Sequence, residues 1–332
     1  MKRITICLLL STLLISGCGK ASAKADTASS SAEAVSESEV LESISMIAES
    51  GEEETPATEP PVIKTTTPTP EPTPEPVDTT PETISFDESW EFGENSMIHT
   101  GQAILYKAEH DRKDIVIGVN AGHGCEGGSA ERTFCHPDQT PKVTGGSTAE
   151  GSITATACAT GMDFYDGTPE REVTLAEAQT LKALLLENGY DVLMIRDEED
   201  VQLDNIARTL ICNAYADCHI AIHWDGDDLD YDKGCYYMSV PDALKEMYPV
   251  RDTWEKSNHL GDCLINGLIS KECIIFDNGS MQMDLTQTSY SKVPSIDIEL
   301  GNAASDHSQE ILDQLAQGLL AGIDEFFKDY KE

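Results

Sequence analysis

Apolar residues in this chain group into short runs and helical stripes from residue 114 onward. Five apolar runs have the length of strands, at 114–120, 190–195, 218–223, 234–240 and 295–300. Elsewhere apolar residues recur every three or four positions, which predicts helices over 172–188, 204–216 and 253–269 and a final helix carrying Ile311 and Phe327. Strands that alternate with helices predict an α/β fold with a mainly parallel sheet flanked by helices.

A further apolar run lies at the start of the chain, over residues 4–15, after a basic Lys2-Arg3. It is too short to span a bilayer as a helix, which takes about 20 residues, and is typical of an export signal. It ends at Ser16-Gly17-Cys18, which resembles a bacterial lipobox. We therefore expect residues 1–18 to be a lipoprotein signal peptide, with Cys18 lipidated and the protein anchored to the extracytoplasmic face of the cell membrane. An ordinary signal peptide with a chance cysteine is the alternative.

Residues 19–85 show no apolar periodicity and are rich in Ser, Thr, Ala, Glu and Pro. Nine of the fifteen prolines lie between Pro56 and Pro81. This composition cannot bury a core and favours extended polyproline II. We expect a disordered tether that holds a folded domain, residues 86–332, away from the membrane.

The chain has 60 acidic and 22 basic side chains, for a formal charge of -38. Such a balance excludes a nucleic-acid binder that works by neutralising phosphates, because that needs clustered Lys and Arg. The tether contains only 14 of the acids. The domain itself is therefore strongly acidic.

Eight cysteines belong to the expected domain, and an exported domain permits disulfides. No pairing can be assigned from the sequence, and reduced thiols stay open as the alternative. The eight are Cys125, Cys135, Cys158, Cys212, Cys218, Cys235, Cys263 and Cys273.

Polar residues with catalytic chemistry stand at the ends of the predicted elements. His123 follows the first strand, His223 ends another, Glu170 stands just before a helix, and Glu299 ends a late strand. Sites in parallel α/β sheets collect at the carboxyl ends of strands. Two His and one Glu can form a three-ligand zinc site with an open fourth position, and a further carboxylate can act as general base and acid.

The segments around these four residues resemble the zinc-dependent N-acetylmuramoyl-L-alanine amidases of the family-3 type. The similarity covers most of 114–327 in one unbroken order, through the stretches 115–124, 167–175, 187–196, 205–214, 220–223 and 291–301. The resemblance implies that His123, Glu170 and His223 hold Zn²⁺ and that Glu299 is the catalytic residue. It also implies hydrolysis of the amide between N-acetylmuramic acid and L-alanine in cell-wall peptidoglycan.

Two other functions stay open. One is a catalytically inactive, amidase-like module that binds peptidoglycan or regulates a partner, and the other is a zinc peptidase. Asn120, Trp224 and Asn302 depart from the family pattern. An Asp at position 120 could act as an acceptor for a zinc ligand, and Asn is a weaker one. The insertion over 124–166 is either a rim over the cleft or a surface excursion stapled by a disulfide.

Other polar residues are interpreted as structural. His136 in the insertion is expected to be an exposed loop residue, and His219, on the same strand face as His223, a packed core histidine. Arg196 and Arg208 are expected to be structural ion-pair partners. The acidic stretch 227–232 lacks the pattern of a calcium loop and is expected to be a solvated turn.

Overall fold

The computed structural model describes residues 78–328. The expected signal peptide, Cys18 and almost all of the expected tether lie outside this part of the chain. Among residues 78–328, no helix is long and apolar enough to cross a membrane.

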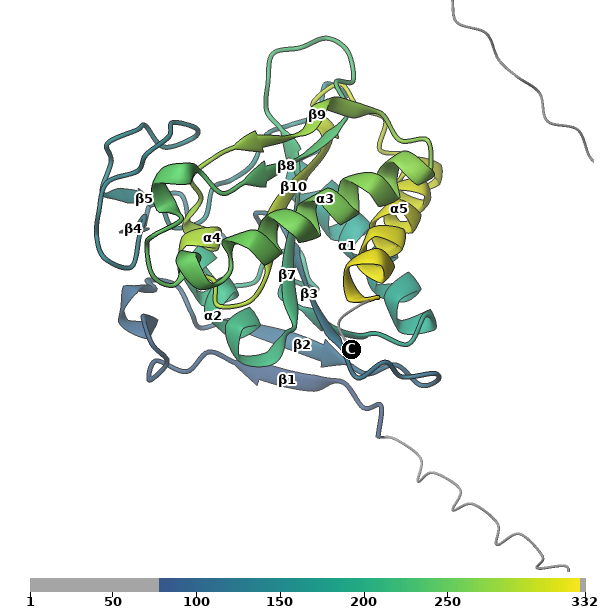
Figure 1. The fold of residues 1–332 in the computed structure, drawn as a ribbon, viewed down its shortest axis with the longest axis horizontal. Coiled ribbons are helices and arrows are strands. Elements are labelled where there is room, and N and C mark those ends of the chain that lie inside the picture. Colours follow the sequence, from purple (N-terminus) through teal and green to yellow (C-terminus); the bar gives the residue numbers. More distant parts are fainter. Residues whose placement is uncertain (1–77, 329–332) are drawn as a thin grey trace, which may run out of the picture. The chain divides into compact units, whose positions relative to one another are not determined.

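The described chain forms ten strands, five α-helices and three short 3-10 helices, which follow one another along the sequence (Figure 1). The strands are β1 Glu82–Ser85, β2 Gln102–Tyr106, β3 Val116–Ala121, β4 Arg132–Phe134, β5 Thr154–Thr156, β6 Asp191–Met194, β7 Cys218–Asp225, β8 Cys235–Ser239, β9 Ile275–Gln282 and β10 Ser295–Asn302. The α-helices are α1 Glu170–Glu187, α2 Asn205–Tyr215, α3 Trp254–Ser270, α4 Thr286–Tyr290 and α5 Gln309–Phe327. The 3-10 helices are η1 Gly93–Asn95, η2 Asp242–Leu244 and η3 Val250–Asp252.

Eight strands make one mixed sheet in the order β1-β2-β6-β3-β7-β10-β8-β9. Its centre, β6-β3-β7-β10, is parallel throughout, whereas β2 and β8 join that centre in antiparallel pairs. The expected α/β fold with a mainly parallel sheet is therefore confirmed. Strands β4 and β5 form a separate antiparallel pair within the 124–166 insertion.

The central strands bury both of their faces, and the two faces differ in chemistry. Residues that alternate along β3, β7 and β10 point to opposite sides. One side is apolar and packs against α1, α3 and α5, which cover that face of the sheet (Figure 1). It includes Ile117, Val119, Ile220, Ile222, Ile296 and Ile298. This apolar layer is the main core of the domain.

The opposite side of the same strands is polar. Register places Asn120 beside Ala221 and Glu299 beside His223, so the polar residues of three strands share one surface. Helix α2 covers part of it, where Arg208 donates to Asn120 Oδ1 over 3.1 Å. A strand that is buried on both faces appears in the sequence as a nearly continuous apolar run, without the alternation of a half-buried strand. The sequence therefore predicted the strands but not the division between the two faces.

The domain begins earlier than residue 86. Glu82–Ser85 forms strand β1, which pairs with β2 at the edge of the sheet. Ile84 is buried in a small core with Leu193 and Ile211. This segment was expected to belong to the tether, because a four-residue edge strand with one buried apolar residue shows no periodicity of its own.

His219 is fully buried on the polar face, as expected of a core histidine. Asn120 Nδ2 donates to His219 Nε2 over 3.1 Å, so the ring proton sits on Nδ1, which has no hydrogen-bond partner among residues 78–328. Burial, helped by the charge of Arg208, lowers the pKa of His219 to about 3. Asn120 thus bridges Arg208 and a neutral imidazole, a role that needs both the amide donor and the amide acceptor of Asn.

We expect His219 to make the domain less stable in acid. Its pKa is lower in the folded than in the unfolded protein, where it is about 6.5. As the pH falls from about 6.5 toward 3, His219 binds a proton in the unfolded chain but stays neutral in the folded chain. The free energy of unfolding should fall by up to about 1.4 kcal/mol per pH unit from this group. Urea unfolding between pH 7 and pH 4 should show a shallower pH slope for His219→Gln than for the wild type.

The control variant is His110→Gln, since His110 is an exposed imidazole. Its pH slope should match that of the wild type. Equal slopes for His219→Gln and the wild type would contradict the account.

Candidate metal centre and surrounding cleft

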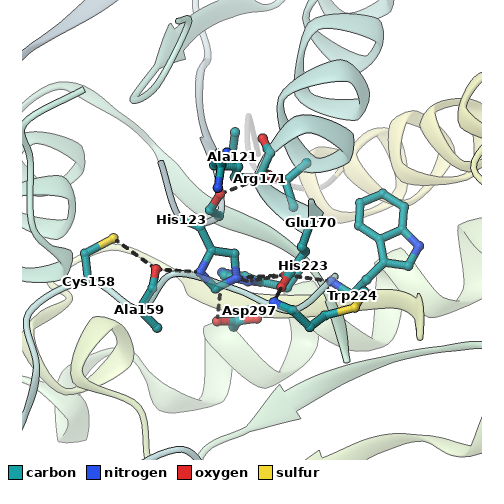
Figure 2. A network of polar contacts seen from close by, with 12 residues as sticks. Ala121, His123, Cys158, Ala159, Glu170, Arg171, His223, Trp224 and Asp297 are labelled. Carbon is teal, nitrogen blue, oxygen red and sulfur yellow. Dashed lines mark hydrogen bonds and ion pairs between the residues drawn. The ribbon is translucent and has the colours of Figure 1, made fainter. Parts of the chain in front are cut away.

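Three donor side chains converge where β3, β7 and α1 meet. The donor atoms of His123, Glu170 and His223 all lie within 4.8 Å of one another. Glu170 Oε1 lies 2.8 Å from His123 Nε2 and 3.1 Å from His223 Nδ1, and the two ring nitrogens are 3.0 Å apart. Figure 2 shows the three side chains pointing toward a common centre. The structure therefore brings together the three residues that the sequence named as ligands.

Each donor is placed by the end of a regular element. His123 stands two residues beyond β3, in a left-handed backbone conformation with φ 64°. His223 lies near the end of β7. Glu170 is the first residue of α1, rather than preceding it, and its carboxylate is held by the backbone N–H groups of Met162 at 2.9 Å and Trp224 at 3.1 Å.

Two glycines leave the space that the donors occupy. A Cβ at Gly122 would overlap the His223 ring. A Cβ at Gly161, where φ is +89°, would lie 2.8 Å from His123 Cδ2 and 2.9 Å from Glu170 Oε2. Such approaches are too close for any other residue. The glycines thus make room for the two imidazoles and the carboxylate.

Two buried arginines hold the turn that carries His123. Arg208 donates to the carbonyls of Ala121 at 3.1 Å and His123 at 2.6 Å, while Arg196 donates to those of Ala121 at 3.2 Å and Gly122 at 2.9 Å. The expected structural role is correct, but the expected ion pairs are not. Within residues 78–328 these guanidinium groups hydrogen-bond mainly to backbone carbonyls, because a turn between a buried strand and the cleft leaves those acceptors unpaired.

The outer nitrogen of His123 has its own partner. His123 Nδ1 lies 2.8 Å from the carbonyl oxygen of Ala159. Figure 2 shows these two groups side by side, with the contact drawn. A carbonyl only accepts, so Nδ1 carries a proton. In the neutral ring, the form that binds a metal, Nε2 is then the bare nitrogen, and it faces Glu170. Metal-binding histidines are commonly oriented in this way.

The charge balance of the cluster favours a cation at its centre. Burial by itself would raise the pKa of Glu170, but hydrogen bonds from His123 and His223 hold it well below its ordinary range. Burial would also lower the pKa of His223, but Asp297 and then Glu170 raise it to about 10. The carboxylates therefore stabilise positive charge on the His223 imidazole.

These residues fit a zinc ion. Two imidazole nitrogens and one ionised carboxylate are zinc donors, and three protein ligands leave a position open in catalytic sites. The glycine-lined space and the protonated Nδ1 of His123 fit the same role.

Glu299 is held beside the cluster by β10. Register sets it next to His223, and its side chain is only 9% exposed. Its Oε2 is buried without a hydrogen-bond partner among the described residues. Burial, reinforced by the charge of Asp297, raises the pKa of Glu299 well above its ordinary value. A carboxylate in this setting is a good proton acceptor.

The cluster opens into a cavity of about 670 Å³. Its walls come from the three donors, from Asp297 and Glu299, from the 124–166 insertion and from the segment between β9 and α4. The insertion contributes Lys142, Gly146, Ser147, Thr148, Ala155, Thr156 and 158–162, and the β9–α4 side contributes Met283, Leu285, Thr286 and Gln287. The insertion is therefore a rim of the cleft.

A buried network fastens this rim. His136 was expected to be exposed, but it is fully buried, and its Nε2 lies 2.9 and 3.0 Å from the carboxylate oxygens of Asp284. Asp284 also accepts from Val143 N at 2.7 Å, and its carbonyl accepts from Lys142 Nζ. The expectation failed because Asp284 lies 148 residues away in sequence and its pairing with His136 exists only in the fold.

Within residues 78–328, no disulfide fastens the insertion. All eight cysteines in the described part of the chain are free thiols, and seven of them are buried. The alternative of an excursion stapled by a disulfide is therefore wrong.

The other departures from the family pattern have structural roles. Trp224 is 2% exposed and packs edge-on against Phe164. Asn302 Nδ2 donates to Asp227 Oδ1 at 2.8 Å and to the Tyr231 carbonyl at 3.0 Å. The acidic stretch after β7 is thus only partly a solvated turn, since Asp227 also pairs with Lys233 at 2.8 Å.

The sequence did not reveal two residues of the cleft wall, Asp297 and Lys142, or Asp284, which fastens the rim. Asp297 carried a usable signal, because it alternates with Glu299 on the same strand and must share its face. Lys142 and Asp284 carried none, since their contact joins two loops.

The comparisons with known proteins agree with this geometry. The model of the Amidase_3 family, described as N-acetylmuramoyl-L-alanine amidase, matches residues 117–324, more than half of the chain. No curated protein matches the sequence.

Solved structures share the fold. The N-acetylmuramyl-L-alanine amidase Ami1 of Mycobacterium smegmatis has a TM-score of 0.54 at 17% identity, over 65% of this chain and 97% of that one. The apo form of Ami1 from Mycobacterium abscessus has a TM-score of 0.53 at 19% identity, over 64% of this chain and 99% of that one. With the family match over 117–324 and the mainly parallel sheet, the chain belongs to the N-acetylmuramoyl-L-alanine amidase family, Amidase_3.

Proposed function

We propose that this protein is a zinc-dependent hydrolase of the amide bond between N-acetylmuramic acid and L-alanine in peptidoglycan. The observation that carries the proposal is the convergence of His123, Glu170 and His223 beside the buried carboxylate of Glu299 in one cavity. Membership of the amidase family supplies the substrate class.

His123, Glu170 and His223 would hold the zinc. Bound zinc supplies a Lewis acid that polarises the amide carbonyl and lowers the pKa of water. The two arginines and the Ala159 carbonyl keep His123 oriented before any metal arrives. Preorganised ligands of this kind need little rearrangement on binding.

Glu299 would move the protons of the reaction. A raised pKa makes its carboxylate the stronger base, so it can take a proton from the attacking water. It can then return that proton to the amine that leaves with L-alanine. Its burial keeps competing bulk water away from the transfer.

The function is tested with the purified full-length chain and soluble muramyl peptides. We expect zinc-loaded protein to release a stem peptide with a free L-alanine amine. A chelator should abolish this release until zinc is restored, because His123, Glu170 and His223 act only through the metal. Mass spectrometry of the products distinguishes the alternatives. Shortened stem peptides would identify a peptidase. Muramyl peptides that stay unchanged with zinc-loaded protein would identify a catalytically inactive binding module.

Replacing Glu299 by Gln should separate catalysis from metal binding. The amide keeps the shape of the side chain but cannot accept the proton, so kcat should fall by about 10²- to 10⁴-fold. Zinc stoichiometry should stay the same, because Glu299 is outside the three-donor cluster. Glu150→Gln, at an exposed acid of the rim, is the control and should keep full activity. Full activity of Glu299→Gln would refute the proton-transfer role.

We also propose that the protein is a lipoprotein, anchored through Cys18 to the extracytoplasmic face of the membrane, with residues 19 onward as a tether. The support is the basic start, the short apolar run and the Ser16-Gly17-Cys18 ending. This places the enzyme next to its proposed wall substrate.

Metabolic labelling of the protein in bacterial cells with a radioactive fatty acid tests the anchor. The wild type should take up label, and Cys18→Ser should not, because the thiol is the proposed attachment point. Cys7→Ser lies within the apolar run and should keep the label. An unlabelled wild type would rule out the anchor.

A further inference from the structure

Strand β10 brings two carboxylates to the metal centre, and only Glu299 has a role so far. Asp297 and Glu299 are two residues apart on the strand and point to the same polar face. Register sets Asp297 beside Ala221 and Glu299 beside His223 on β7. Both carboxylates line the cavity.

The two nitrogens of His223 face different groups. Nδ1 points into the donor cluster, 3.1 Å from Glu170 Oε1 and 3.0 Å from His123 Nε2. Nε2 points the other way and lies 3.7 Å from Asp297 Oδ2. Figure 2 shows Asp297 beside His223 with the contact drawn. If Nδ1 is to bind metal it must be bare, and the proton of the neutral ring then sits on Nε2, facing Asp297.

Asp297 is free to serve His223. Its side chain is only 15% exposed, and among residues 78–328 His223 is the basic side chain with which it forms an ion pair. Its other oxygen, Oδ1, is buried without a hydrogen-bond partner in this part of the chain. Leaving a buried carboxylate oxygen unpaired is costly. No hydrogen bond to Asp297 Oδ1 from the described residues offsets that free-energy cost.

Asp297 is not one of the donors. The cluster whose ligand atoms lie within 4.8 Å of one another consists of His123, Glu170 and His223. His123 already has an acceptor behind it, the Ala159 carbonyl at 2.8 Å from Nδ1. Among the described residues, Asp297 is the acceptor that faces His223 Nε2. Each imidazole then has one nitrogen toward the centre and one toward a protein oxygen.

We propose that Asp297 is a positioning residue that orients His223 and selects the tautomer in which Nδ1 binds zinc. This inference rests on the proposed zinc site. With Nδ1 bare for the metal, Nε2–H would face the Asp297 carboxylate as a donor faces an acceptor, across the contact of 3.7 Å. In this role Asp297 acts through His223.

Zinc affinity of the purified full-length chain tests the proposal, by competition with a chromophoric chelator. Loss of an acceptor behind a metal-binding histidine weakens binding by about 10- to 100-fold. We expect a loss in that range for Asp297→Ala and a smaller one for Asp297→Asn, whose amide oxygen still accepts from Nε2. A residue with a merely structural role would lower the thermal midpoint of the metal-free protein instead, so that midpoint is measured for every variant.

The matched control is Glu177→Gln in α1. Glu177, like Asp297, is an acid with a buried oxygen that has no hydrogen-bond partner in the described chain. It is fully buried and lies outside the cavity lining. Its zinc affinity should equal that of the wild type. An equal loss in Glu177→Gln and Asp297→Ala would overturn the proposal, because the effect would then come from any buried acid.

The outcomes separate this inference from the proposed function. A wild type that binds zinc while both Asp297 variants bind it equally tightly overturns the positioning role and leaves the zinc site standing. A wild type that binds no zinc overturns both. If Asp297→Ala fails to fold, Asp297→Asn decides the question, since it keeps the volume of the side chain and removes only its charge.

Discussion

The metal centre depends on the turn from Ala121 to His123, which two buried arginines hold in place. Arg196 and Arg208 donate to three successive carbonyls of this turn, and Arg208 also reaches Asn120. The backbone at His123 is left-handed, which costs free energy for a residue with a Cβ. The guanidinium groups offset this cost, because each makes several hydrogen bonds to acceptors that the end of a strand leaves unpaired.

The same arginines contribute to the charge balance of the cleft. Glu170, Asp297 and Glu299 approach one another within a domain that is already strongly acidic. Burial and the neighbouring charge of Arg208 lower the pKa of Arg196 to about 9, so burying two cations together carries its own cost. Positive charge on the turn and negative charge on β10 leave the centre suited to a cation held between them.

The two faces of the sheet differ in function. Its apolar face packs against α1, α3 and α5 and supplies most of the buried core. Its polar face carries Asn120, His219, His223 and the carboxylates of β10. The cleft is completed by an insertion that His136 and Asp284 fasten to the opposite wall. The residues that stabilise the domain and the residues of the proposed metal centre thus lie on opposite sides of the same strands.

Local pattern in the sequence predicted the central strands β3, β6, β7, β8 and β10 and the helices α1, α2, α3 and α5. It also placed His123, Glu170, His223 and Glu299 at the ends of predicted elements, where the carboxyl edge of a parallel sheet gathers such residues. It was silent on β1, because one buried Ile84 makes no pattern. It misjudged His136 and left Asp297 unnoticed, because their partners Asp284 and His223 lie far away along the chain. Only tertiary structure decides such pairings. Burial removes water as the competing partner, and the distance between two side chains then decides what each of them can do.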